Sequence, residues 1–148
     1  MRMRAVALLI ENDRVALIER HRPGRHYFTF PGGGVGRGET LEQTVVREMK
    51  EETGLLVIVI KLIAEVWYKG NQQFYFLARA EDGIFGTGDG EEYTNPRPDD
   101  LDVGTYRPLW MPVSEIRSKP VLPQEIARIV VKAHRDGWPE QPVVIFEE

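Results

Sequence analysis

The sequence contains no cysteine among its 148 residues. Disulfide bonds and thiolate ligands are therefore excluded as sources of stability or of metal binding. A chain of this length buries about two-thirds of the surface that its unfolded form exposes, so it needs no covalent cross-link to fold. Its composition, 42% hydrophobic and 28% charged, is ordinary for a soluble protein, and we predict one domain over residues 1–148.

Long apolar runs are also missing. Ala5–Ile10 ends at Glu11, and Leu55–Ile60 ends at Lys61. Both runs fall far short of the roughly 18 residues that cross a bilayer, and no small-residue cleavage site follows the first of them. We therefore expect a soluble, cytoplasmic protein that does not bind a membrane.

Positive charge is not in excess, because 19 Lys and Arg face 23 Asp and Glu, for a formal net charge of −4. Duplex DNA and anionic membranes reward clustered positive charge, so we expect neither as a partner. A small polyphosphate is not excluded, since bound cations can make one site positive within an acidic chain.

Short runs rich in β-branched and aromatic residues predict the strands. Ala5–Ile10 and Val15–Arg20 flank a turn-rich spacer and predict a hairpin, and a second hairpin is predicted around Gly70. The predicted strands are residues 5–10, 15–20, 27–30, 55–68, 72–80, 106–111 and 143–146. Residues 81–104 are rich in Gly, Asp, Glu and Pro with little periodicity, and we predict a long loop there.

Two helices are predicted on opposite faces of a mixed sheet, in an α/β fold. Residues 40–52 begin with a capping box formed by Thr40 and Gln43 and end at Gly54. Residues 123–136 space their apolar side chains by three and four, as an amphipathic helix does. Between the predicted strand at residues 27–30 and the first predicted helix, residues 31–38 hold five glycines in eight positions. We expect an irregular loop there.

The end of the first predicted helix carries three acids, Glu48, Glu51 and Glu52. Neighbouring carboxylates about 5 Å apart repel by roughly 3 kcal/mol at an effective dielectric near 20, and the helix dipole disfavours acids at a C-terminus. One interpretation is a solvated acidic helix end, screened by Arg47 and Lys50. We favour a hard divalent cation such as Mg²⁺, which takes carboxylate oxygens and leaves positions for substrate phosphates.

The spacing of these residues resembles the Nudix box. That box reads Gly, five residues, Glu, seven residues, Arg-Glu-apolar, any residue, Glu-Glu, any residue, Gly-apolar. Every fixed position is filled here, by Gly33, Glu39, Arg47, Glu48, Met49, Glu51, Glu52, Gly54 and Leu55. The segment Phe30-Pro31-Gly32 before it is also similar to the family.

The resemblance implies a Nudix-type α/β/α sandwich with a mixed central β-sheet and a loop-helix-loop catalytic motif. It implies Mg²⁺, or alternatively Mn²⁺, held by Glu48, Glu51, Glu52 and the carbonyl of Gly32. Glu52 would orient or deprotonate the attacking water, and Arg47 would pair with the box carboxylates, with support from Glu39. The implied reaction is hydrolysis of a nucleoside diphosphate linked to another group.

Residues outside the box are candidates for binding the substrate. Arg20, Arg22 and Arg25 form a cationic segment before the glycine-rich loop, and arginine suits bidentate phosphate contacts. Tyr27 or Tyr68 is a candidate to stack on a base, while Glu91 and Glu92 in the long loop are candidates for an extra metal ligand or general base. We interpret His21 and His26 as surface or packing residues, because carboxylates already suffice for a hard metal.

The substrate itself stays open at this stage. Residues 71–73 are Asn-Gln-Gln and supply neither the tyrosine of dinucleoside polyphosphate hydrolases nor the proline of ADP-ribose hydrolases. The default is therefore a nucleoside triphosphate or its oxidised form, cleaved to monophosphate and pyrophosphate in the manner of MutT-like proteins. Alternatives are hydrolysis of a nucleoside diphosphate-sugar or ADP-ribose, and a non-catalytic nucleotide sensor. The resemblance also allows a homodimer.

Overall fold

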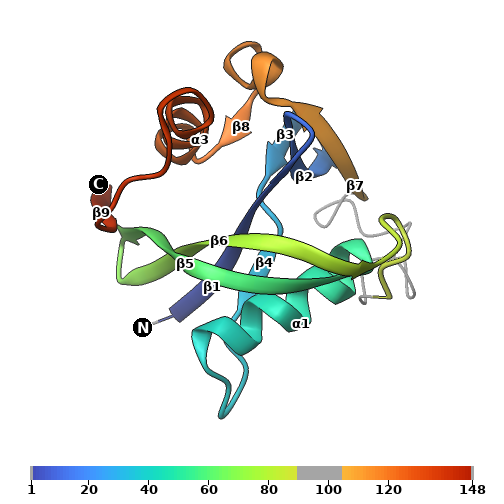
Figure 1. Ribbon diagram of the computed structural model, residues 1–148, viewed down its shortest axis with the longest axis vertical. Coiled ribbons are helices and arrows are strands. Elements are labelled where there is room, and N and C mark those ends of the chain that lie inside the picture. The colour runs from blue at the N-terminus through green and yellow to red at the C-terminus, as the bar shows by residue number, and fades with distance from the viewer. Residues whose placement is uncertain (1, 90–104, 148) are drawn as a thin grey trace.

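The computed structural model describes residues 2–89 and 105–147. The strands are β1 (Arg2–Glu11), β2 (Arg14–Arg22), β3 (Arg25–Thr29), β4 (Gly32–Gly34), β5 (Leu55–Tyr68), β6 (Asn71–Gly83), β7 (Thr105–Pro112), β8 (Val121–Leu122) and β9 (Val143–Glu147). The helices are α1 (Leu41–Thr53), α3 (Gln124–Asp136) and the 3₁₀ helix η1 (Val113–Ser118). The strands form a curled mixed sheet in the order β8-β3-β2-β1-β6-β5-β9, with β4 beside β1 and β7 beside β2 (Figure 1).

Both predicted hairpins are present. Asn12 and Asp13 connect β1 to β2 with positive φ angles of 51° and 63°, and Lys69 and Gly70 connect β5 to β6 at 46° and 80°. Two consecutive residues with positive φ match the right-handed twist of the strands that they join. Asx and glycine residues at these turns therefore fix where the strands reverse.

Strand β1 divides the sheet into two parts. One of its edges pairs in parallel with β6, whereas its other edge pairs with β4 at residues 4–6 and with β2 only at Ile10 and Glu11. Beyond that short contact, β2 pairs with β3 and β7 instead. The part with β2, β3 and β7 therefore diverges from the part with β6, β5 and β9, as Figure 1 shows.

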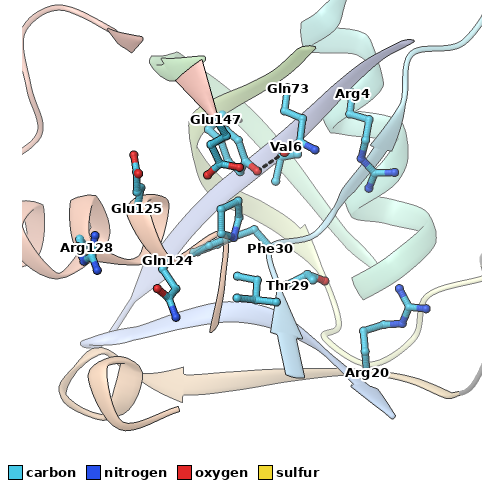
Figure 2. Close-up of a pocket in the computed structure, with 13 residues that line it drawn as sticks. Arg4, Val6, Arg20, Thr29, Phe30, Gln73, Gln124, Glu125, Arg128 and Glu147 are labelled. Carbon is cyan, nitrogen blue, oxygen red and sulfur yellow. Dashed lines mark hydrogen bonds between the residues drawn. The ribbon is translucent and has the colours of Figure 1, made fainter. Parts of the chain in front are cut away.

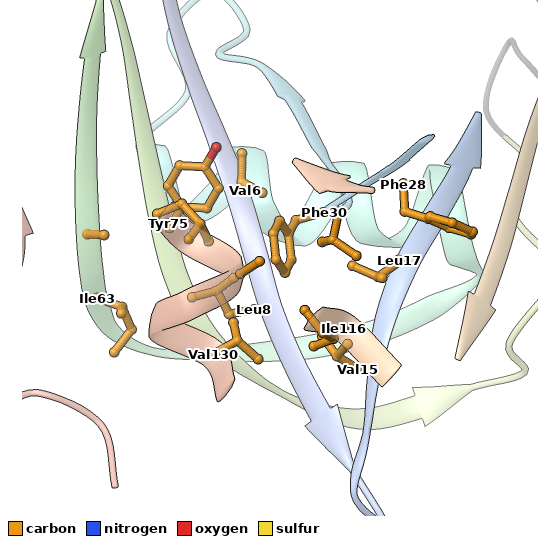
Figure 3. Close-up of a cluster of buried hydrophobic side chains, with 14 of the residues drawn as sticks. Val6, Leu8, Val15, Leu17, Phe28, Phe30, Ile63, Tyr75, Ile116 and Val130 are labelled. Atoms are coloured by element: carbon orange, nitrogen blue, oxygen red, sulfur yellow. The ribbon is translucent and has the colours of Figure 1, made fainter. Parts of the chain in front are cut away.

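Alternate side chains of β1 enter two separate hydrophobic cores. Val6 and Leu8 belong to one cluster with Val130 of α3, drawn in Figure 3. Ala5, Ala7 and Leu9 belong to another cluster with Val45 and Met49 of α1. Because successive side chains of a strand point to opposite faces, the two helices cover opposite sides of the sheet. The predicted α/β/α sandwich is confirmed.

The prediction of an irregular loop over residues 31–38 was wrong in part. Gly32–Gly34 form β4, which pairs antiparallel with β1. A Cβ on Gly32 would lie 2.6 Å from the Cα of Val6, so only glycine lets the two backbones approach this closely. The glycines of this segment thus permit a strand where their composition suggested none.

Helix α1 begins and ends as predicted. The Thr40 hydroxyl accepts from the backbone N–H of Gln43, the Gln43 side chain accepts from the N–H of Thr40, and Gly54 ends the helix at φ 84°. Strand β6 continues to Gly83, opposite Leu55, so the predicted loop begins later than residue 81. Glu91 and Glu92 lie outside the described residues. No helix in the described part of the chain is long and apolar enough to cross a bilayer.

Candidate active site

The last turns of α1 lie against β4. Glu52 is buried, with 8% of its surface exposed, and its Oε2 accepts a hydrogen bond from the Gly32 N–H at 3.2 Å. A Cβ on Gly33 would collide with the carboxylate of Glu48. The two glycines therefore let the backbone of β4 approach two of the three acids that the box predicts as metal ligands.

Arg47 joins the acids of α1 to the segment before it. Its Nε donates to Glu39 Oε2 at 2.8 Å, and its Nη1 donates to Glu48 Oε1 at 2.9 Å and to Glu51 Oε2 at 3.2 Å. Its Nη2 donates to the carbonyl of Gly34 at 3.1 Å. One guanidinium thus orients three carboxylates and one strand of the sheet, and these charges hold the pKa of Arg47 above its ordinary value.

Glu39 receives hydrogen bonds from three residues of this network. Hydrogen bonds from Arg47, from the Gly36 N–H at 2.7 Å and from the Thr44 hydroxyl at 3.0 Å stabilise its carboxylate. They lower the pKa of Glu39 to about 2, although its partial desolvation acts in the opposite direction. Glu39 is therefore ionised at any physiological pH and ties the loop to the helix.

Glu48, Glu51 and Glu52 share one end of α1 but do not form a tight cluster. Among the residues described, the one set of three or more His, Cys, Asp or Glu ligand atoms within 4.8 Å of one another lies elsewhere, at Glu19, His21 and His26. Arg47 instead lies between Glu48 and Glu51. Carboxylate and carbonyl oxygens are nevertheless the donors that a hard divalent cation prefers, so the chemistry of this set fits Mg²⁺ or Mn²⁺.

A pocket of about 650 Å³ lies between the two parts of the sheet. In Figure 2, Gln124, Glu125 and Arg128 of α3 approach it from one side, and Arg4 and Arg20 lie on the other. Phe30 forms part of the wall and packs edge-on against Tyr75. The Tyr75 hydroxyl donates to Gln73 Oε1 at 2.6 Å, and burial raises the pKa of this tyrosine. The pocket therefore combines aromatic walls with amide and charged groups.

The structure separates the predicted substrate residues. Arg20 lines the pocket, and its guanidinium lies 3.7 Å from the ring centroid of Tyr106. Tyr27 is buried beneath Arg20 and Arg25, and Arg22 pairs with Arg25 in the exposed hairpin. Tyr68 lies in the β5–β6 hairpin with Lys69 over its ring. Of these five, Arg20 alone is placed to meet a ligand in this pocket.

Several pocket residues were missed from the sequence. Gln73, Tyr75, Gln124 and Glu147 come from β6, α3 and β9, which are distant in the chain. No local motif marks them, because they meet only when the sheet closes around α3. The Phe30-Pro31-Gly32 segment was the one local signal, since it links the pocket wall to the backbone that bonds Glu52.

Comparison with known proteins adds a family match. A family model described as NUDIX domain matches residues 1–132. An ADP-ribose pyrophosphatase of Methanocaldococcus jannaschii is 49% identical over 61 residues, which cover 40% of this chain and 36% of that protein. An RNA pyrophosphohydrolase of Acinetobacter baylyi is 38% identical over 60 residues, covering the same two shares. These alignments thus span little more than a third of either relative.

Solved structures share the fold at low sequence identity. A structure from work on MutT of Aliivibrio salmonicida and Vibrio cholerae superposes with a TM-score of 0.66 at 18% identity. The superposition covers 88% of this chain and 96% of that one. At this identity, the likeness concerns the arrangement of the elements alone.

Proposed function

Because this chain belongs to the Nudix hydrolase family, we propose that it is a metal-dependent pyrophosphohydrolase that cleaves a nucleoside diphosphate linked to another group. The observation that carries the proposal is the contact of α1 with β4. There the Gly32 N–H bonds Glu52, and Gly33 leaves room for the carboxylate of Glu48. The backbone of β4 and the guanidinium of Arg47 thus hold the carboxylates of the box at one end of α1.

We assign Mg²⁺, with Mn²⁺ as an alternative, to the carboxylates of Glu48, Glu51 and Glu52 and the carbonyl of Gly32. When bound, the cation supplies Lewis-acid stabilisation of phosphate oxygens and lowers the pKa of water. Arg47 keeps Glu48 and Glu51 oriented, and its own position is fixed by Glu39 and Gly34. Arg47 and the Gly32 N–H thus restrict where the carboxylates lie before a cation binds.

Glu52 is our candidate for orienting or deprotonating the attacking water. One of its oxygens accepts from the Gly32 N–H, and its side chain is buried at the edge of the helix that packs on the sheet. A fixed carboxylate can accept a proton from a water molecule aligned with the scissile bond. Glu91 and Glu92, outside the described residues, stay candidates for the same role.

The pocket between the two parts of the sheet is our candidate site for the nucleoside. Its aromatic walls suit a base, and Gln73 and Gln124 supply groups that can bond the edge of one. Arg20 is the cation of the predicted segment that lines it, and we assign it to a phosphate of the substrate. A nucleoside triphosphate, oxidised or not, is the leading substrate, and the products would be the monophosphate and pyrophosphate.

One observation favours a second substrate class, ADP-ribose. The relative that is 49% identical over 61 residues is named an ADP-ribose pyrophosphatase, and ADP-ribose also contains a nucleoside diphosphate linked to another group. The same carboxylates would serve both reactions. A non-catalytic sensor is less well supported, because every fixed position of the box is filled.

The test is a screen of canonical and oxidised nucleoside triphosphates, dinucleoside polyphosphates, ADP-ribose and nucleotide sugars with Mg²⁺ or Mn²⁺. Glu52→Gln should lower kcat by about 10²–10⁴-fold, the usual range for removal of a general base. Glu42→Gln is the matched control, since Glu42 is an exposed acid in the first turn of the same helix. Turnover of every active substrate at the wild-type rate by Glu52→Gln would disprove the assignment, and no turnover of any would favour the sensor.

A further inference from the structure

Three potential metal ligands meet at the outer end of the β2–β3 hairpin. His21 and His26 are directly opposite each other in the antiparallel register, and Glu19 lies two residues before His21. Side chains two apart on a strand share a face, so all three project to the same side. One ligand atom from each lies within 4.8 Å of the others.

Glu19 is the fixed member of this group. It is 8% exposed, and its Oε2 lies 2.8 Å from His26 Nε2 while its Oε1 accepts from Arg107 Nε at 2.8 Å. Burial alone would raise the pKa of Glu19, but the hydrogen bonds from His26 and Arg107 lower it on balance. Arg107 thus engages one oxygen of the carboxylate and leaves the other turned to the histidines.

The two histidines are the adjustable members. Their rings stack at a centroid distance of 4.1 Å with 8° between the planes, and 49% of the His26 side chain is exposed. Ligand atoms on a tetrahedral zinc ion are about 3.4 Å apart, given metal–ligand bonds near 2.1 Å. The exposed imidazoles would have to rotate out of their stack to bring all three ligand atoms to that distance.

We propose that Glu19, His21 and His26 form a binding site for a borderline divalent transition metal of the zinc type. Two imidazole nitrogens and one carboxylate select such ions over Mg²⁺, which prefers oxygen ligands. Arg107 remains on the second carboxylate oxygen and orients it, as hydrogen-bond partners of metal ligands commonly do.

This site is separate from the carboxylates of α1. Glu19 projects to the same side of β2 as Leu17, which packs in the core covered by α3. Arg20 projects to the opposite side and lines the substrate pocket. A metal at Glu19 would therefore fix the β2–β3 hairpin from behind Arg20, without contacting the nucleotide site.

The alternative is a network without metal, in which Arg107 and His26 hydrogen-bond the carboxylate of Glu19. The two interpretations differ in a measurable way, because only the first predicts stoichiometric binding of a transition metal. The probe is Co²⁺, whose visible absorption reports nitrogen and oxygen ligands in a four- or five-coordinate site.

The experiment titrates the full chain, without a polyhistidine tag, with Co²⁺ in the presence of excess Mg²⁺. We expect one equivalent of Co²⁺ to bind, and Zn²⁺ to displace it. Saturating Mg²⁺ should leave the absorption band in place, since Mg²⁺ competes only at oxygen sites. Absence of binding, or displacement by Mg²⁺, would overturn the proposal.

Variants locate the ion. His21→Ala and His26→Ala should each lose the band, whereas His134→Ala should keep it. His134 is the third of the chain's three histidines and lies in α3 beside Asp13. Glu52→Gln should also keep the band, which separates this site from the proposed Mg²⁺ site. Circular dichroism checks that each variant is folded, and an unchanged band in a folded His21→Ala variant would contradict the proposal.

Discussion

The Arg47 guanidinium binds the Glu39 carboxylate through two parallel hydrogen bonds, from Nε to Oε2 at 2.8 Å and from Nη2 to Oε1 at 3.0 Å. This side-on pairing uses both oxygens of Glu39 and leaves Nη1 for Glu48 and Glu51. Geometry of this kind requires the planar guanidinium, because an ammonium group cannot present paired donors.

Arg47→Lys should therefore reduce activity even though it preserves the charge. The ammonium of lysine lacks the planar fork that bonds both oxygens of Glu39 and still reaches Glu48, Glu51 and Gly34, so several of these hydrogen bonds are lost. We expect the stability to fall by about 1–2 kcal/mol, a range discounted for the partial exposure of Arg47, and kcat to fall more than KM rises. Steady-state kinetics and urea unfolding measure the two effects. Unchanged kinetics in the lysine variant would show that the fork geometry is not used.

The lowered pKa of Glu39 leads us to expect that the stability of the fold depends on pH in the acid range. The folded pKa is about 2 against an ordinary value of 4.5, so the ionised form is favoured by folding. Its contribution to stability is present above about pH 4.5 and is lost as the pH falls toward 2. Glu39→Gln should be less stable than the wild type at neutral pH, and the difference should shrink across this window. Urea unfolding at stepwise lower pH tests this, and a difference that stayed constant would contradict the assignment.

Gly33→Ala should weaken the metal site more than the fold. The added Cβ collides with the Glu48 carboxylate, which must move away from its place beside β4. We expect a destabilisation of about 1–3 kcal/mol, typical of overpacking, together with a clear loss of Mg²⁺-dependent turnover. Gly34→Ala is the matched control, because no atom lies within 4 Å of a Cβ at that position. Equal losses in both variants would disprove the role given to Glu48.

Arg20→Ala should reduce kcat/KM by about ten- to a hundredfold, the equivalent of one charge-assisted hydrogen bond. The effect should appear mainly in KM if Arg20 holds a phosphate that does not react. Arg79→Ala removes an exposed arginine on β6 and serves as the control. If both variants lose the same activity, the loss reflects net charge and not the pocket.

Substitutions of Met49 test how closely α1 packs against the sheet. Its side chain is fully enclosed in the core between α1 and the sheet. Met49→Leu keeps the volume and should cost less than about 1.5 kcal/mol, while Met49→Ala should cost about 2–5 kcal/mol. Thermal unfolding measures the stability of the two variants. A large loss in the leucine variant would show that this core depends on the flexible thioether.

Most elements of the fold were predictable because their signals are local. The capping box of Thr40 and Gln43, the stop at Gly54 and the turns at Asn12 and Gly70 each act within a few residues. Strand β4 was not predictable in this way, since glycine disfavours a strand and only the neighbouring Val6 explains it. The short elements β8 and η1 carry too few residues for any period to appear.

The residues of the candidate site likewise differ in whether a local sequence signal marks them. The resemblance implied that Arg47 pairs with the box carboxylates, and the structure places its guanidinium against Glu39, Glu48 and Glu51. The roles of these residues in metal binding and catalysis stay predictions. Glu19 and Arg107, which are 88 positions apart, gave no signal at all. Neither did Gln124 or Glu147 in the pocket, because a sequence pattern carries no information on which distant strands become neighbours.

The division of β1 between two sets of partners has a consequence for how the chain tolerates change. A single residue inserted in the middle of this strand would exchange its inward and outward side chains beyond that point. Leu8 would leave the core under α3 and Leu9 would leave the core under α1 in the same event. An insertion at the turn of Asn12 and Asp13, by contrast, would leave the side-chain pattern of β1 unchanged and would affect the contacts of Asp13 with Val113 and His134. The length of β1 is therefore fixed by both cores at once.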